Sequence, residues 1–180
     1  KIFVSYKELK GIPEKYQNKI CEIGNIIRKE ILHFQAGTDS NLIEKKLKIL
    51  ILGGSQAAKI FAEKLPEIFK NCKEAKISFK LYQQCLPEQN NLLINFYKDL
   101  NIEYETFNFT KDILNYFSKV NLAITRSGSS ILAELVNVKI PFISIPLPTS
   151  ADNHQLKNAI YYEKKEYSYL IEEKYLNRKL

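Results

Sequence analysis

The chain has 180 residues, a hydrophobic share of 45% and a formal net charge of +7. This length allows one domain with a real core, and the ordinary hydrophobic share excludes a disordered or collagen-like chain. The lysines are scattered among glutamates and aspartates, so the charge favours a solubilising surface over a nucleic-acid-binding face. A contact with a membrane surface or an anionic ligand is the remaining alternative.

The cysteines and histidines do not form a metal-binding pattern. Cys21, Cys72 and Cys85 are odd in number and lack metal-type spacing, and only His33 and His154 could assist them. We therefore expect reduced thiols, a cytoplasmic protein and no zinc site. No apolar run is long enough for a membrane span and the first residues do not resemble a signal peptide, so membrane contact should be peripheral.

Residues 1–45 are interpreted as an inter-domain junction and linker. The opening stretch has no clear amphipathic helix, and residues 33–46 have no sustained period, which is typical of a loop or hinge. We place the main domain at residues 46–180. Because the chain begins without Met, we expect it to be a piece of a longer protein.

From residue 47 onward, strand and helix patterns alternate. LKILIL (47–52) is a mainly apolar run before two glycines, typical of a strand buried on both faces. Further strands are expected at 75–84, 102–109, 121–125, 139–146 and 167–173, and helices at 55–70, 90–101, 111–120, 129–138 and 153–166. The alternation predicts an α/β fold, a Rossmann-like parallel sheet with helices on both faces.

Right-handed crossovers place all strand-to-helix loops at one edge of such a sheet, where ligands bind. In the first loop, Gly53 and Gly54 allow a tight turn, and Ser55 is a candidate N-cap beside free helix N–H groups that favour an anion. The loop has neither GK[ST] nor GxGxxG, which argues against a Walker or dinucleotide motif. An ordinary connection would use the same residues, so both interpretations stay open.

A second loop of this kind follows the strand at 121–125. Gly128 supplies the turn, and Ser129 or Ser130 is expected to cap the next helix. Glu134 in that helix is either a surface residue favoured by the helix dipole, by about 0.3–1 kcal/mol, or a carboxylate that accepts hydrogen bonds from a sugar diol. Arg126 either pairs with a nearby carboxylate or organises the loop.

A third loop lies in PLPTSADNHQLKNA (146–159). Asp152 and Asn153 are expected caps of the helix that follows, which places His154 and Gln155 in its first turn at the same sheet edge. No recognisable nucleophile motif or acid–base pair is present. The three loops therefore predict a binding site and leave catalysis unassigned.

GGSQAA (53–58), RSGSSILAE (126–134) and PLPTSADNHQLKNA, in this order and spacing, resemble the carboxyl-terminal half of the MurG family. GNIIRKEIL (24–32) is similar to that family's junction segment, and the resemblance covers roughly residues 20–175. It implies the C-terminal domain of a GT-B glycosyltransferase that binds UDP-N-acetylglucosamine. Complete members transfer N-acetylglucosamine to lipid I, forming lipid II in peptidoglycan synthesis.

The resemblance also implies roles for single residues. Ser55 would meet the diphosphate with Arg28 close to it, Thr110 would contact uracil through its backbone, and Gln155 would hold the sugar hydroxyls. Glu134 would bind the ribose hydroxyls. The segment that wraps the sugar and ribose comprises Ser129, Ser130, Ile131, Leu132, Ala133 and Glu134.

No catalytic residue, metal or cofactor is implied in this chain, because the family's amino-terminal domain with its acceptor site is not among these residues. We expect the complete protein to be an inverting, metal-independent hexosyltransferase and this chain alone to be inactive. Its expected partners are UDP-N-acetylglucosamine, lipid I through the other domain and the inner face of the cytoplasmic membrane, where the protein would be peripheral. Nucleic acid is not an expected partner.

Two departures and two alternatives accompany the resemblance. Ala57 stands where the family usually has a glycine, and Ile26 replaces a proline before the junction arginine. The chain is alternatively a separately encoded, non-catalytic nucleotide-sugar-binding subunit of a split GT-B transferase. A generic Rossmann-like nucleotide binder is the third possibility, and it would accept adenine nucleotides.

Overall fold

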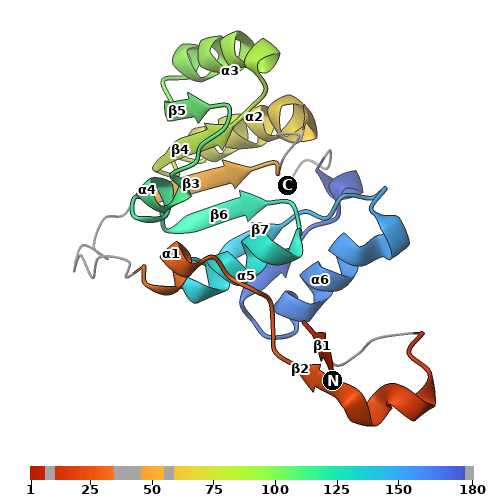
Figure 1. The fold of residues 1–180 in the computed structure, drawn as a ribbon. Helices are drawn as coiled ribbons and strands as arrows, with labels where there is room; N and C mark the ends of the chain where they lie inside the picture. The colour runs from red at the N-terminus through yellow and green to blue at the C-terminus, as the bar shows by residue number, and fades with distance from the viewer. Residues whose placement is uncertain (7–10, 35–45, 55–58, 177–180) are drawn as a thin grey trace.

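The computed structural model describes residues 1–6, 11–34, 46–54 and 59–176 of the chain. Its centre is a six-stranded parallel sheet with the strand order β5-β4-β3-β6-β7-β8 (Figure 1). The strands are β3 (Leu47–Leu52), β4 (Phe79–Gln84), β5 (Glu103–Phe107), β6 (Leu122–Thr125), β7 (Phe142–Ser144) and β8 (Ser168–Leu170). The predicted α/β fold is confirmed.

Helices cover both faces of the sheet. The helices are α1 (Lys29–Leu32), α2 (Lys59–Glu74), α3 (Pro87–Asp99), α4 (Ile113–Phe117), α5 (Ser129–Asn137) and α6 (His154–Glu163), with 3-10 turns η2 (Ala151–Asn153) and η3 (Glu173–Tyr175). One apolar cluster joins one sheet face to α2 and α3, and a second joins the opposite face to α1, α4, α5 and α6. The sheet is therefore the middle layer of three.

The apolar run of β3 explains why it forms the centre of the sheet. Successive strand residues point to opposite faces, so Ile49 and Ile51 pack in the cluster with α2 while Leu50 and Leu52 pack in the cluster with α5. All four side chains are buried. A strand segment covered on both faces needs apolar residues at every position, and residues 49–52 supply them.

The strand order reverses between β3 and β6. The chain first builds outward from β3 to β4 and β5, then returns to place β6 on the other side of β3 and continues to β7 and β8. The loops after β3 and β6 consequently start side by side, and the Arg126 N–H donates to the Leu52 carbonyl at 3.2 Å. Ligands of open parallel sheets bind at such a reversal, beyond the carboxyl ends of the strands.

The predicted helix boundaries shift by a few residues. The described part of α2 begins at Lys59 and ends at Glu74, four residues beyond the predicted end. Its end is set by Lys76, whose φ of 59° is left-handed, and by the Ile77 N–H, which donates to the Cys72 carbonyl at 3.0 Å. Glycine usually occupies this position, so a lysine there gives no recognisable stop signal.

Residues 1–34 contain regular structure that the sequence patterns did not indicate. β1 (Ile2–Val4) and β2 (Ile20–Glu22) form a parallel pair, joined through the 3-10 helix η1 (Glu14–Lys19). Strands of three residues are too short to show a period. Asn25 donates from Nδ2 to the hydroxyls of Tyr6 at 3.0 Å and Tyr162 at 3.2 Å, which fastens this segment to α6.

Among all the residues that the structure describes, no helix is both long enough and apolar enough to cross a bilayer.

Candidate functional site

The glycine turn after β3 is held by the neighbouring strand. The Gly53 N–H donates to Oε1 of Gln84, the last residue of β4, at 3.1 Å. Gly54 has a φ of 78°, a left-handed conformation that glycine adopts without strain. The turn therefore forms as predicted, whereas Ser55 lies outside the described residues and its contact with a diphosphate stays a prediction.

The turn after β6 differs from its prediction in one detail. Gly128 is itself the N-cap of α5, with φ −66° and ψ 137°, and the Leu132 N–H donates to its carbonyl at 3.2 Å. The expectation that Ser129 or Ser130 caps α5 is wrong, because both are already inside the helix. With no side-chain cap, the first N–H groups of α5 have no partner within the helix and can receive an anion.

Glu134 lies in the second turn of α5 and pairs with Arg28. Arg28 Nε donates to Oε1 and Nη2 donates to Oε2, both at 2.8 Å. The Glu134 side chain is 7% exposed and that of Arg28 is 52% exposed. This hydrogen bonding raises the pKa of Arg28 above its usual value. Glu134 is therefore a buried, paired carboxylate, which corrects its interpretation as a surface residue.

Arg28 is held in place by the segment that carries it. It precedes α1 as its N-cap, and the Ile31 N–H donates to its carbonyl at 3.0 Å. Ile31 is buried in the cluster with α5, and Asn137 Nδ2 donates to the Ile31 carbonyl at 2.9 Å. In addition to the pair with Glu134, these two contacts attach residues 28–32 to α5.

Gln155 joins the loops after β6 and β7. Its Oε1 accepts from the N–H groups of Ser127 at 3.1 Å and Leu147 at 3.0 Å. Among the described residues its Nε2 has no hydrogen-bond partner, so it can donate to a ligand oxygen. Asn153 is the N-cap residue of α6, as predicted, but its side chain makes no capping hydrogen bond, and Asp152 lies inside η2. Ser150 Oγ instead accepts from the Gln155 N–H, at 3.3 Å.

Arg126 does both things that were predicted as alternatives: it pairs with a carboxylate and it organises the loop. Its Nη2 lies 2.5 Å from Oε2 of Glu173, and its Nη1 donates to the carbonyls of Ile145 and Pro146, each at 3.2 Å. The guanidinium also lies 4.9 Å from the centre of the Phe61 ring. Because the residue is 8% exposed, Arg126 organises the loops and does not reach toward a ligand.

The remaining predicted residues have mixed accessibility. Thr110 follows β5, is partly exposed, and its Oγ1 accepts from the Asp112 N–H at 3.0 Å. Leu132 and Ala133 are buried, while Ile131 is partly exposed. Only the backbone or an edge of this part of α5 could meet a ligand, and ligand contact by Thr110, Ile131, Leu132 and Ala133 stays a prediction.

Three supporting residues were missed by the sequence analysis. Gln84 holds the turn after β3, Asn137 holds α1 against α5, and Asn158 donates from Nδ2 to the Ser127 carbonyl at 3.0 Å. Gln84 ends an expected strand at the ligand-binding edge, which is a usable signal. The two asparagines lie inside helices, where nothing in their neighbours marks a distant partner.

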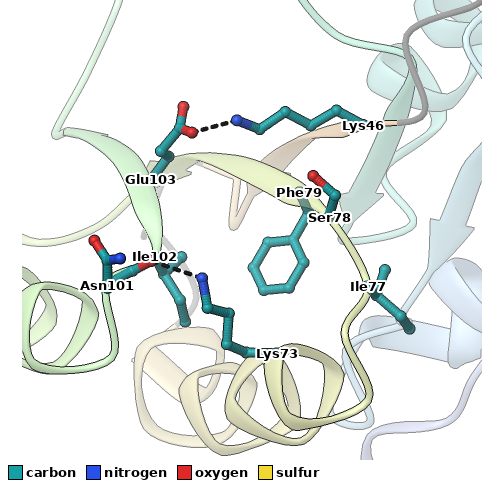
Figure 2. Close-up of a pocket in the computed structure, with 8 residues that line it drawn as sticks. All are labelled: Lys46, Lys73, Ile77, Ser78, Phe79, Asn101, Ile102 and Glu103. Atoms are coloured by element: carbon teal, nitrogen blue, oxygen red, sulfur yellow. Dashed lines mark hydrogen bonds and ion pairs between the residues drawn. The ribbon is translucent and has the colours of Figure 1, made fainter.

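Two hollows elsewhere do not suit a nucleotide. One of about 80 Å³ lies at the opposite edge of the sheet, where Lys46 pairs with Glu103 and Lys73 donates to the Asn101 carbonyl (Figure 2). Ligand pockets usually measure about 300–1,000 Å³. The other, of about 440 Å³ between α2 and α3, has a net negative lining that would repel a diphosphate, because it contains three glutamates and one lysine: Glu63, Glu67, Glu88 and Lys59.

The described residues contain no group of three or more His, Cys, Asp or Glu side chains that could hold a metal ion. The arrangement at the reversal instead offers backbone N–H groups for an anion, a buried carboxylate for hydroxyl groups and a free amide donor. Such a set of groups can bind a ligand that carries both an anionic group and hydroxyl groups.

Comparison with known proteins shows that this chain is similar to glycosyltransferases. Residues 48–180 match the glycosyltransferase family 28 C-terminal domain. The chain is 39% identical over 183 residues to a UDP-N-acetylglucosamine–N-acetylmuramyl-(pentapeptide) pyrophosphoryl-undecaprenol N-acetylglucosamine transferase of Pelagibacter ubique (strain HTCC1062), covering 99% of this chain and 49% of the relative. It is 39% identical over 166 residues to a transferase of the same name from Rickettsia bellii (strain RML369-C), covering 88% and 46%.

A solved structure of a related protein shows a similar fold. The crystal structure of MurG from Acinetobacter baumannii superposes with a TM-score of 0.74 at 23% identity, covering 92% of this chain and 51% of that chain. This chain spans about half the length of the curated relatives it matches. The predicted resemblance is confirmed: the chain belongs to the MurG family of glycosyltransferases and supplies the family 28 C-terminal domain.

Proposed function

We propose that this chain is the donor-binding part of an N-acetylglucosaminyltransferase that takes UDP-N-acetylglucosamine. The observation that carries the proposal is the juxtaposition at the strand-order reversal of two helix-preceding turns, one buried carboxylate and one free amide donor. The relatives from Pelagibacter and Rickettsia are named as transferases of this sugar, which supports the choice of donor.

Each part of the donor has a group to receive it. The first N–H groups of α5 would bind the diphosphate. Neighbouring strands lie about 4.8 Å apart, so a diphosphate bound there would also lie beside the glycine turn after β3. Glu134 would accept from the ribose hydroxyls and Gln155 Nε2 would donate to the sugar. Thr110 follows β5, about 14 Å from β6 across three strand spacings, which requires a ligand as extended as a nucleotide.

The complete protein would transfer the sugar to lipid I and form lipid II, with inversion at the anomeric carbon and without a metal ion. Developing charge on the departing UDP would then be met by helix N-termini and cations. The acceptor and the cytoplasmic membrane surface would be contacted chiefly through the other half of the protein. Since transfer requires both substrates to be held together, we expect no turnover by this chain alone.

Isothermal titration calorimetry with UDP-N-acetylglucosamine tests donor binding. We expect binding by the wild type, rejection of ADP-sugars and a loss of about 1–3 kcal/mol in Glu134→Ala, because the diol hydrogen bonds disappear. Glu74→Ala, at the far end of α2, is the matched control and should bind as the wild type does. Absence of binding by the folded wild type, or equal affinity for ADP- and UDP-sugars, would refute the proposal.

A further inference from the structure

The pair between Arg28 and Glu134 fixes the direction of a carboxylate. Two parallel hydrogen bonds of 2.8 Å place the guanidinium and carboxylate in one plane. A single bond would let the carboxylate rotate about it, whereas a paired fork does not. The two residues are separated by 106 positions in the chain, so only the tertiary structure brings them together.

The burial of Glu134 makes its partner necessary. The side chain is 7% exposed, and a carboxylate removed from water needs a counter-charge or hydrogen bonds to remain ionised. Among the described residues, every hydrogen bond and ion pair of the Glu134 side chain is with Arg28. Arg28 therefore supplies the compensation for burying this charge on α5.

The segment that carries the Arg28 guanidinium is itself held in place. Arg28 begins α1, whose residue Ile31 is 1% exposed against α5, and Asn137 donates to the Ile31 carbonyl. This second attachment lies on α5 itself, three residues after Glu134. The same helix thus carries the carboxylate and the anchor of its partner.

The pairing leaves hydrogen-bond acceptor capacity on Glu134. An ionised carboxylate has about four lone-pair positions, and Arg28 occupies one on each oxygen. Each oxygen can therefore accept one further hydrogen bond, which suits two neighbouring hydroxyls. We propose that Arg28 is a positioning residue for ribose selection, which acts by orienting Glu134 toward the 2′- and 3′-hydroxyls; this inference rests on the proposed function.

The proposal differs from a direct contact between Arg28 and the diphosphate, and a ligand series separates the two. The titrants are UDP and 2′-deoxyuridine diphosphate, which have the same phosphates but differ in one hydroxyl. For the wild type we expect about tenfold tighter binding of UDP, the effect of one charge-assisted hydrogen bond. In Arg28→Gln the preference should fall to about onefold to twofold, with the affinity for the deoxy ligand nearly unchanged.

Four further variants sharpen the test. Arg28→Lys keeps the charge but not the fork and should give an intermediate preference. The double variant Arg28→Gln/Glu134→Gln should discriminate no less than Glu134→Gln alone, because residues that act as one unit are not additive. Lys29→Gln removes a neighbouring exposed cation and should leave both affinities as in the wild type. Thermal melts establish that each protein is folded.

The outcomes are distinct. Equal losses for UDP and the deoxy ligand in Arg28→Gln would overturn the inference and assign Arg28 to the diphosphate. An unchanged preference in that variant would also overturn it. Failure of the folded wild type to bind UDP would instead refute the proposed function itself, before any variant is compared.

Discussion

Arg126 and Glu173 form an ion pair beneath the loops of the candidate site. Their closest atoms, Nη2 and Oε2, are 2.5 Å apart, and their side chains are 10% and 24% exposed. The pair connects the end of β6 to η3, far along the chain. Arg126 also donates to two carbonyls of the loop after β7. It therefore links that loop to η3, the last described turn of the protein.

Replacing Glu173 should destabilise the protein. Glu173→Gln leaves a buried guanidinium without its counter-charge. The free energy of unfolding should fall by about 3 kcal/mol, the lower end of the range for broken buried ion pairs. Urea unfolding measures the loss. Glu172→Gln, beside it but more exposed, is the control and should change stability little. A stability of Glu173→Gln equal to that of the control would show that the pair contributes nothing.

Two substitutions separate the structural and ligand-binding parts of Gln155. Gln155→Leu removes the acceptor of two backbone N–H groups and should lower stability by about 1–3 kcal/mol. Gln155→Glu keeps an acceptor for both but loses the Nε2 donor, so it should retain stability and bind UDP-N-acetylglucosamine more weakly. Denaturation and calorimetry on the same samples check this, and wild-type donor affinity in Gln155→Glu would exclude the sugar contact.

A buried hydrogen bond between β4 and α3 allows a double-mutant test. Tyr97 donates its hydroxyl to Oε1 of Gln83 at 2.5 Å, and both residues are fully buried. Tyr97→Phe should cost about 1–3 kcal/mol because the Gln83 oxygen is left unpaired. Adding Gln83→Leu should recover part of that loss. Strictly additive losses in the double variant would contradict the expected coupling.

Tyr116 should make the protein less stable at high pH. Burial, followed by the hydrogen bond that its hydroxyl donates to Glu105, raises the pKa of Tyr116 to about 12 from 10. The folded state therefore keeps this proton between pH 10 and 12, where the unfolded state loses it, and stability falls as pH rises through that interval. Tyr116→Phe should lose less stability over the same interval in urea titrations; parallel curves would refute the assignment.

The order of strands and helices from residue 47 onward was predictable from the sequence. Apolar runs, helical spacing and glycine turns depend on neighbours a few residues apart, so β3 and the turns at Gly53 and Gly128 could be located from local patterns. The short pair β1 and β2 could not, because three-residue strands have no period. Helix ends at left-handed non-glycine residues such as Lys76 were also missed, because these residues give no recognisable stop signal.

The contacts within the site were decided by tertiary structure. The sequence alone identified Arg28, Glu134 and Gln155 as candidates through resemblance, but it could not indicate that Arg28 binds Glu134 or that Gln155 holds two loops. Nor could it choose between the alternatives for Arg126. These partners lie far apart in the chain, and their distances depend on strand order and on α1 packing against α5, which local residue patterns do not encode.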